Sequence, residues 1–206
     1  MADKRLSKIT YNEARLILSA QTLEQCPEDT GGEAAFAGYS NTGKSSVLNA
    51  ITGVHGLARA SKAPGRTRLL NFFSLGHGRR LVDLPGYGYA RVSAEMKRQW
   101  EEAMSEYLEN RRSLLGLMLI MDIRHPLKAM DLNLLDWCRE GGIPVRILLN
   151  KADKLSRSAG MRVLQETGKQ VGDVATVQLF SAHSRLGVDA SRHWLDALFK
   201  QAPYKS

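Results

Sequence analysis

The chain has 206 residues, of which 43% are apolar and 24% charged, a balance typical of one globular domain with a substantial core. Two cysteines do not make a disulfide framework at this length and indicate a reducing compartment, so we expect a cytoplasmic protein. The N-terminal residues lack the apolar segment of a signal peptide, and the longest apolar run, residues 114–121, is too short to cross a bilayer.

Predicted strands and helices alternate along the chain. A buried strand is expected at residues 33–38 and a helix at 44–51, and the strand candidates TRLLNFFSL and RRLVDL flank a hairpin turn, Gly76-His77-Gly78. Further helices are predicted at 94–110, 129–140, 156–171 and 188–200, and further strands at 114–122, 144–150 and 177–182. This alternation predicts an α/β fold with a mostly parallel sheet, which binds ligands at the carboxyl ends of its strands.

The segment GYSNTGKSS matches the phosphate-binding pattern G-x-x-x-x-G-K-S between a predicted strand and a predicted helix. Glycines bracket the loop because only glycine lets the backbone come so close to phosphate, and successive N–H groups with the helix N-terminus form an anion cradle. Lys44 is expected to reach the β- and γ-phosphates, and the Ser45 hydroxyl to bind Mg²⁺. The loop residues expected to line the nucleotide are Gly38, Tyr39, Ser40, Asn41, Thr42, Gly43, Lys44, Ser45 and Ser46.

A second motif, DLPG at residues 83–86, ends the strand candidate RRLVDL. Asp83 is suited to hold Mg²⁺ through water, and the Gly86 N–H to touch the γ-phosphate. An aspartate before a Pro-Gly turn would by itself carry little weight. Its place after a strand, downstream of a phosphate loop, favours the nucleotide role.

The motif NKAD at residues 150–153 selects the base. The Asp153 carboxylate can accept hydrogen bonds from N1–H and the 2-amino group of guanine, whereas adenine has neither donor there and would leave the carboxylate unpaired. Asn150 is expected to tie this loop to the phosphate loop, and the Lys151 stem to cover the base. Ser181 and Ala182 end the next predicted strand, where the Ala182 N–H is expected to meet guanine O6.

Thr67 lies in the polar segment APGRT between the first helix and the hairpin. A threonine here can complete the Mg²⁺ shell while the γ-phosphate is present, so loss of that phosphate would release the segment. The alternative is an ordinary loop threonine. We expect nucleotide contacts from Pro64, Gly65, Arg66 and Thr67, and catalytic roles for Lys44, Thr67 and Gly86.

Together these motifs resemble those of translation-factor-class GTPases. The stretches AFAGYSNTGKSSVLNA, PGRT, LVDLPGYGYA and MDIRHPLKAMD more narrowly resemble the EngB family of bacterial ribosome-assembly GTPases, over roughly residues 10–200. The resemblance implies a single P-loop G domain at residues 29–202 with a six-stranded mixed sheet, one antiparallel edge strand and helices on both faces. It assigns residues 1–28 to an N-terminal extension packed on or leading into that domain.

The resemblance further implies GTP, GDP and Mg²⁺ as ligands, slow GTP hydrolysis, and a part in large ribosomal subunit assembly, the cell cycle and septation. The expected partners are the large-subunit precursor and ribosomal RNA, without membrane contact, and the expected state is a monomer. Alternatives are a signalling GTPase that acts on a protein partner and a P-loop phosphotransferase, which NKAD disfavours.

Basic residues crowd the segments expected to respond to the nucleotide. They are Arg59, Lys62, Arg66, Arg68, Arg91, Lys97 and Arg98. With the net charge of +8, they favour a ribosomal RNA footprint, although such a run is often only a solvated face and such a charge is ordinary for solubility.

Three further positions have two interpretations each. Tyr87 stands where related switches place a water-orienting glutamine, so either another group supplies that function or hydrolysis stays slow until a partner docks. Alternatively, Tyr87 and Tyr89 simply pack. The MDIRHP segment, with Asp122, Arg124 and His125, is either a salt-bridged loop or a contact surface. Related GTPases with asparagine at the place of Asn41 hold K⁺ beside the phosphates, which the resemblance extends to this chain; otherwise Asn41 only braces the loop.

Overall fold

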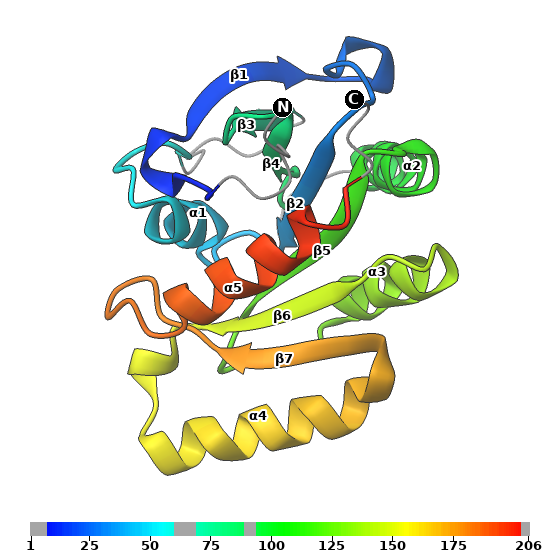
Figure 1. The fold of residues 1–206 in the computed structure, drawn as a ribbon. Helices are drawn as coiled ribbons and strands as arrows, with labels where there is room; N and C mark the ends of the chain where they lie inside the picture. Colours follow the sequence, from blue (N-terminus) through cyan, green and yellow to red (C-terminus); the bar gives the residue numbers. More distant parts are fainter. Residues whose placement is uncertain (1–7, 60–68, 89–93, 203–206) are drawn as a thin grey trace.

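The computed structural model describes residues 8–59, 69–88 and 94–202 of the chain. One seven-stranded sheet runs through it in the order β1-β3-β4-β2-β5-β6-β7, with helices on both faces (Figure 1). The strands are β1 (Arg15–Ala20), β2 (Gly32–Gly38), β3 (Leu70–Ser74), β4 (Arg79–Asp83), β5 (Leu114–Asp122), β6 (Val145–Asn150) and β7 (Ala175–Leu179). The helices are α1 (Lys44–Thr52), α2 (Ala94–Asn110), α3 (Ala129–Glu140), α4 (Arg157–Val171) and α5 (Val188–Phe199). Short 3₁₀ turns lie at η2 (Tyr11–Glu13), η3 (Leu23–Gln25), η4 (Ala152–Lys154) and η5 (Gly172–Val174).

The α/β class with a mixed, mostly parallel sheet is confirmed, but the strand count differs from the expected six. The added strand is β1, which pairs antiparallel with β3 and takes the edge that β3 would otherwise expose. Its sequence, RLILSA, does not alternate cleanly between apolar and polar residues, and its pairing with β3 has an irregularity between Leu16 and Leu18. The predicted hairpin of β3 and β4 is present.

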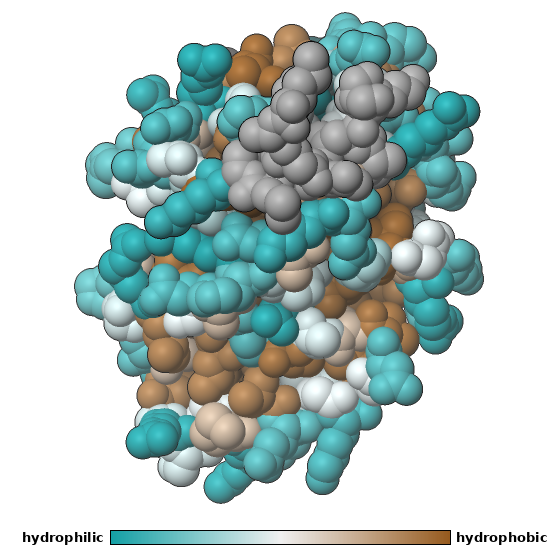
Figure 2. Space-filling view, in the orientation of Figure 1, coloured by the Kyte–Doolittle hydropathy of each residue, from teal (hydrophilic) through white to brown (hydrophobic). Residues whose placement is uncertain are grey.

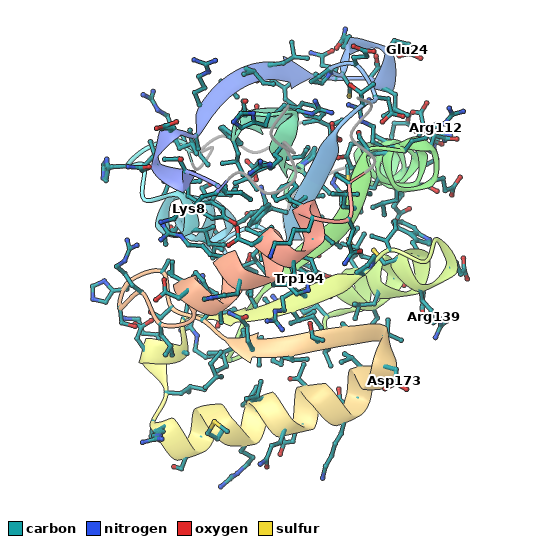
Figure 3. All side chains as sticks on the ribbon, in the orientation of Figure 1. Lys8, Glu24, Arg112, Arg139, Asp173 and Trp194 are labelled. Atoms are coloured by element: carbon teal, nitrogen blue, oxygen red, sulfur yellow. The ribbon has the colours of Figure 1, made fainter. Side chains whose placement is uncertain are left out.

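The two faces of the sheet bury separate apolar clusters. On one face, α1 and α5 pack on Phe36 and Leu148, and on the other face α2 and α3 pack on Leu119 and Leu149. All seven residues of β2 are buried because it lies in mid-sheet with helices on both faces. Figure 3 shows Trp194 on α5 close to β6, and this side chain packs partly on the first cluster.

The last strand begins and ends earlier than predicted, at Ala175–Leu179 rather than 177–182. Phe180 is fully buried in the α1–α5 cluster, so the apolar run continues after the strand has ended. Ser181 and Ala182 therefore lie in a loop beyond the carboxyl end of β7. This loop joins those after β2, β5 and β6 at one edge of the sheet.

On the face drawn in Figure 2, hydrophilic side chains form a band across the middle, and apolar side chains gather in the lower half, in the region of β6, β7 and α4. Leu186 after β7 and Met161 on α4 are among the exposed apolar side chains. Among the described residues, no helix combines the length and the apolar character that a membrane span requires.

Candidate nucleotide-binding site

The loop between β2 and α1 has a shape that only its glycines permit. Gly43 has a φ of 94°, in the left-handed region, and a Cβ at this position would collide with the side chain of Asn150. A Cβ at Gly38 would collide with the carbonyl oxygen of Ile120. Close packing of this loop against β5 and the loop after β6 therefore fixes its course.

The start of α1 fits an anion. No side chain caps this helix, so its first N–H groups remain directed into the loop. The loop closes on itself through the Thr42 hydroxyl, which donates to the Tyr39 carbonyl oxygen at 2.8 Å. Free N–H groups at the positive end of a helix dipole are what a phosphate group requires.

The two charged groups expected near the phosphates lie together. The Lys44 ammonium forms an ion pair with the Asp83 carboxylate, and both side chains are about nine-tenths buried. Within the described part of the chain, the Ser45 hydroxyl has no hydrogen-bond partner, and no three His, Cys, Asp or Glu side chains form a metal cluster. This donor set fits Mg²⁺, which takes one or two protein ligands together with phosphate oxygens and water.

The NKAD loop is tied to the phosphate loop as expected. The Asn150 side-chain amide donates to the Thr42 carbonyl oxygen at 2.8 Å, and its oxygen accepts from the Ala182 N–H at 3.3 Å. Asp153 is exposed, and its carboxylate accepts from the Ser181 hydroxyl at 2.6 Å, which lowers the pKa of this carboxyl group. This hydrogen bond holds the charged Asp153 carboxylate in one orientation, and sequence reasoning missed it.

A cavity of about 580 Å³ opens beside this pair. Gly43, Asn150, Lys151, Asp153 and Ala182 are among the residues that line it. Phosphate-loop and base-selecting residues thus share one cavity at the carboxyl edge of the sheet, where such folds bind nucleotides.

Lys151 braces the site from the base side. Its ammonium donates to the Asn41 carbonyl oxygen at 2.6 Å and pairs with the Asp122 carboxylate at 2.8 Å. Arg124 binds the same carboxylate through two nitrogens, at 2.9 and 2.6 Å, which keeps the pKa of Asp122 well below its usual range. The salt-bridged interpretation of the MDIRHP segment is therefore right for Asp122 and Arg124. Asn41 has a φ of 67° and an exposed side chain.

Several predicted residues lie outside the described part of the chain. They are Lys62, Pro64, Gly65, Arg66, Thr67, Arg68, Tyr89 and Arg91, together with the side chain of Lys97. Of the remaining basic residues, Arg59 is exposed, whereas Arg98 pairs on α2 with Glu95 at 2.9 Å and Glu102 at 3.1 Å.

Tyr87 packs rather than facing the phosphates. It is 3% exposed, and its hydroxyl donates to the Asp131 carboxylate of α3 at 2.7 Å. Burial raises the pKa of this phenol well above its usual value, so it stays protonated. Burial also raises the pKa of Asp131 to about 6, although the Tyr87 and Lys128 hydrogen bonds oppose that shift. Sequence reasoning missed Asp131, whose only local signal is its place in the first turn of a helix.

A P-loop fold in which the glycine loop and the NKAD loop share one cavity, and in which a buried Lys–Asp pair lies at the start of α1, defines a GTP-binding domain. The comparisons agree: a family described as 50S ribosome-binding GTPase matches residues 33–151, more than half of the chain. A probable GTP-binding protein EngB of Coxiella burnetii (strain RSA 331) is 50% identical over 196 residues, covering 94% of this chain and 96% of the relative. That of Nitrosococcus oceani is 53% identical over 189 residues, covering 90% and 94%. The chain therefore belongs to the EngB family of GTP-binding proteins and is a GTPase.

Solved structures show the same fold at lower identity. A crystal structure of a probable GTP-binding protein engB has a TM-score of 0.67 at 20% identity, covering 82% of this chain and 100% of that one. Era in complex with MgGDPNP and nucleotides 1506–1542 of 16S ribosomal RNA has a TM-score of 0.63 at 20% identity, covering 86% of this chain and 58% of Era. At these identities the likeness concerns the fold alone.

Proposed function

We propose that this protein is a slowly hydrolysing GTP switch that binds ribosomal RNA in pre-ribosomal particles and assists assembly of the large ribosomal subunit. Membership of a 50S ribosome-binding GTPase family and the net charge of +8 support this function. The observation that carries the nucleotide part is the shared cavity of Gly43, Asn150 and Asp153. The proposal includes a monomeric, cytoplasmic protein.

For hydrolysis, water attacks the γ-phosphate while this chain holds the phosphates in place. The N–H groups at the start of α1 and the Lys44 ammonium bind phosphate oxygens and stabilise the charge that develops on them. Asp83 and Ser45 would hold Mg²⁺, which supplies further positive charge when bound. Because Tyr87 is buried against Asp131, it does not orient the water, which is consistent with a low rate.

A second ion, K⁺, is also part of the proposal. Asn41 is an exposed residue of the phosphate loop, and its backbone carbonyl oxygen accepts a hydrogen bond from Lys151. An amide oxygen here is suited to a monovalent cation, which would add positive charge where no arginine is assigned to that task. In the alternative role, Asn41 binds no cation and only braces the phosphate loop through hydrogen bonds.

Co-sedimentation with large-subunit precursor particles tests the switch. The GTP-analogue form should pellet with the particles more than the GDP form, because the γ-phosphate orders the segments that carry the basic residues. Equal pelleting in both states would remove the switch from this account. Pelleting that RNase treatment of the particles leaves unchanged would favour the alternative, a GTPase that acts on a protein partner.

A further inference from the structure

Residues 84–88, which follow β4, are held from several sides. The Leu84 N–H donates to the Phe36 carbonyl oxygen at 3.0 Å, and the Trp100 indole N–H of α2 donates to the Pro85 carbonyl oxygen at 3.0 Å. The Ser40 N–H of the phosphate loop donates to the Tyr87 carbonyl oxygen at 2.7 Å. Within the described residues, the N–H of Gly86, at the centre of this segment, has no acceptor.

The Tyr87 side chain anchors the same segment to α3. Its hydroxyl donates to one oxygen of the Asp131 carboxylate, and the other oxygen accepts from the Lys128 N–H at 3.1 Å. Asp131 is 2% exposed, so this bond is shielded from water and depends on a fixed geometry. The Tyr87 ring also packs on the Trp100 ring, with centroids 4.8 Å apart.

Tyr39 joins the phosphate loop to the same anchor. Its hydroxyl accepts from the Met130 N–H at 3.2 Å, next to Asp131, and its ring meets that of Tyr87 edge-on with centroids 4.7 Å apart. A Cβ at Gly88 would collide with the Tyr39 ring, so glycine is required there. The phosphate loop, residues 84–88 and the start of α3 are thus braced against one another.

We propose that Asp131 and Tyr87 are positioning residues for GTP hydrolysis: the Asp131 carboxylate holds the Tyr87 hydroxyl and thereby fixes the free N–H of Gly86 where it meets the γ-phosphate. This inference rests on the proposed contact between Gly86 and the γ-phosphate. GDP has no γ-phosphate, and the backbone hydrogen bond from Ser40 to Tyr87 that ties residues 84–88 to the phosphate loop does not need the Tyr87 hydroxyl. Loss of the anchor therefore changes the binding and hydrolysis of GTP more than the binding of GDP.

The test uses Tyr87→Phe, which keeps the ring and removes the hydroxyl. We expect the affinity for a non-hydrolysable GTP analogue and the single-turnover hydrolysis rate each to fall about three- to tenfold, the usual effect of one lost hydrogen bond, with GDP affinity within about twofold. Asp131→Asn should act in the same direction, and adding it to Tyr87→Phe should change the GTP-analogue affinity little further. Equal losses for GTP analogue and GDP, or additive effects of the two substitutions, would overturn the inference.

Tyr107→Phe is the matched control. The Tyr107 hydroxyl also donates to a buried carboxylate, that of Glu33 at 2.9 Å, but Glu33 lies at the start of β2, the end opposite the phosphate loop. Tyr107 lies in the last turn of α2, three residues before its end at Asn110. This variant should lose similar stability and keep both nucleotide affinities; a loss equal to that of Tyr87→Phe would also overturn the inference. Turnover of the unmodified protein, measured in the same series, tests the proposed function separately.

Discussion

In the proposed site, base selection depends on a single carboxylate. Asp153 is exposed, and the Ser181 hydrogen bond lowers its pKa, so it is ionised at neutral pH and can accept from N1–H and the 2-amino group of guanine. Asp153→Asn should lose GTP affinity by about 10²- to 10⁴-fold, the cost of two charge-assisted bonds, and gain xanthine nucleotide, because its amide can donate to O2 of xanthine. Fluorescence titration measures both affinities. Asp136→Asn on α3 is the control. If Asp153→Asn still prefers GTP, NKAD does not select guanine.

Asn41 provides a test of the second ion. We expect GTP hydrolysis to be at least severalfold faster in K⁺ than in Na⁺ at equal ionic strength, because added positive charge stabilises the phosphoryl group during transfer. Asn41→Ala should remove that difference while GTP affinity changes little. The same turnover in both salts, for the unmodified protein alone and on ribosomal particles, would leave Asn41 as a bracing residue.

The buried carboxylate of Asp131 predicts a pH effect on stability. Burial raises its pKa from 3.8 to about 6 in the folded protein, so the folded state is stabilised by protonation, and this contribution is lost as pH rises from about 4 to 6. Asp131→Asn has no such group. Its unfolding free energy relative to the unmodified protein should therefore increase over that range by up to about 3 kcal/mol and then level off.

Urea unfolding of Asp131→Asn at several pH values between 4.5 and 7.5 measures this difference. The matched variant Asp136→Asn removes an exposed aspartate that pairs with Arg139, and it should show no comparable trend. A difference that stays constant with pH, or falls as pH rises, would show that Asp131 is not buried as an ionised carboxylate.

These residues also show what the sequence could and could not predict about the site. The Asn150 tie was predictable because NKAD is a contiguous motif whose first residue follows a strand. The Tyr87–Asp131 bond joins residues 44 positions apart, and nothing near either residue indicates the other. Contacts of this kind depend on how α3 lies against the sheet, which no local pattern specifies.

Among the elements, β2, β4 and α2 are joined by a buried ionic cluster away from the nucleotide cavity. Glu33 is fully buried and accepts from Arg80 at 2.8 Å, Arg111 at 2.7 Å and Tyr107 at 2.9 Å. Removing one member of such a cluster leaves the other charges uncompensated in the interior. The cluster therefore holds the amino end of β2 to β4 and to the end of α2.

Glu33→Ala should lower the free energy of unfolding by about 3–5 kcal/mol. By contrast, Glu102→Ala removes an exposed partner of Arg98 and should cost less than about 1 kcal/mol. Denaturant titration gives both values. GTP affinity of the folded protein should be unchanged in each, and equal stability of the two variants would show that burial does not make this cluster different.

The predicted elements were most accurate where burial gave a clear pattern. The predicted bounds of β5, α2 and α3 are confirmed. Helices cover both faces of the sheet, so the buried strand is a continuous apolar run and each covering helix carries an apolar stripe. The strand β1 was not predicted, since an irregular edge strand with three exposed residues at its start lacks that pattern. The position of β7 was wrong because Phe180 is buried by tertiary packing after the strand has ended.

For the molecule as a whole, the charge of +8 predicts how binding to particles responds to salt. If binding neutralises about three RNA phosphates, it releases their counterions. Raising the salt concentration from about 50 to about 200 mM should then lower the affinity about tenfold or more. GTP affinity should change far less with salt, because the proposed nucleotide site lies inside the cavity. Binding that does not respond to salt would mean that the basic residues do not contact phosphate.

Two single arginines separate a phosphate contact from net charge. Arg59 is exposed, and no described carboxylate pairs with it, whereas Arg98 is balanced by Glu95 and Glu102. Arg59→Ala and Arg98→Ala lower the net charge equally. Only Arg59→Ala should weaken particle binding and reduce the slope of log affinity against log salt, by about one contact. Equal losses in the two variants would assign the attraction to overall charge rather than to a footprint beside the nucleotide.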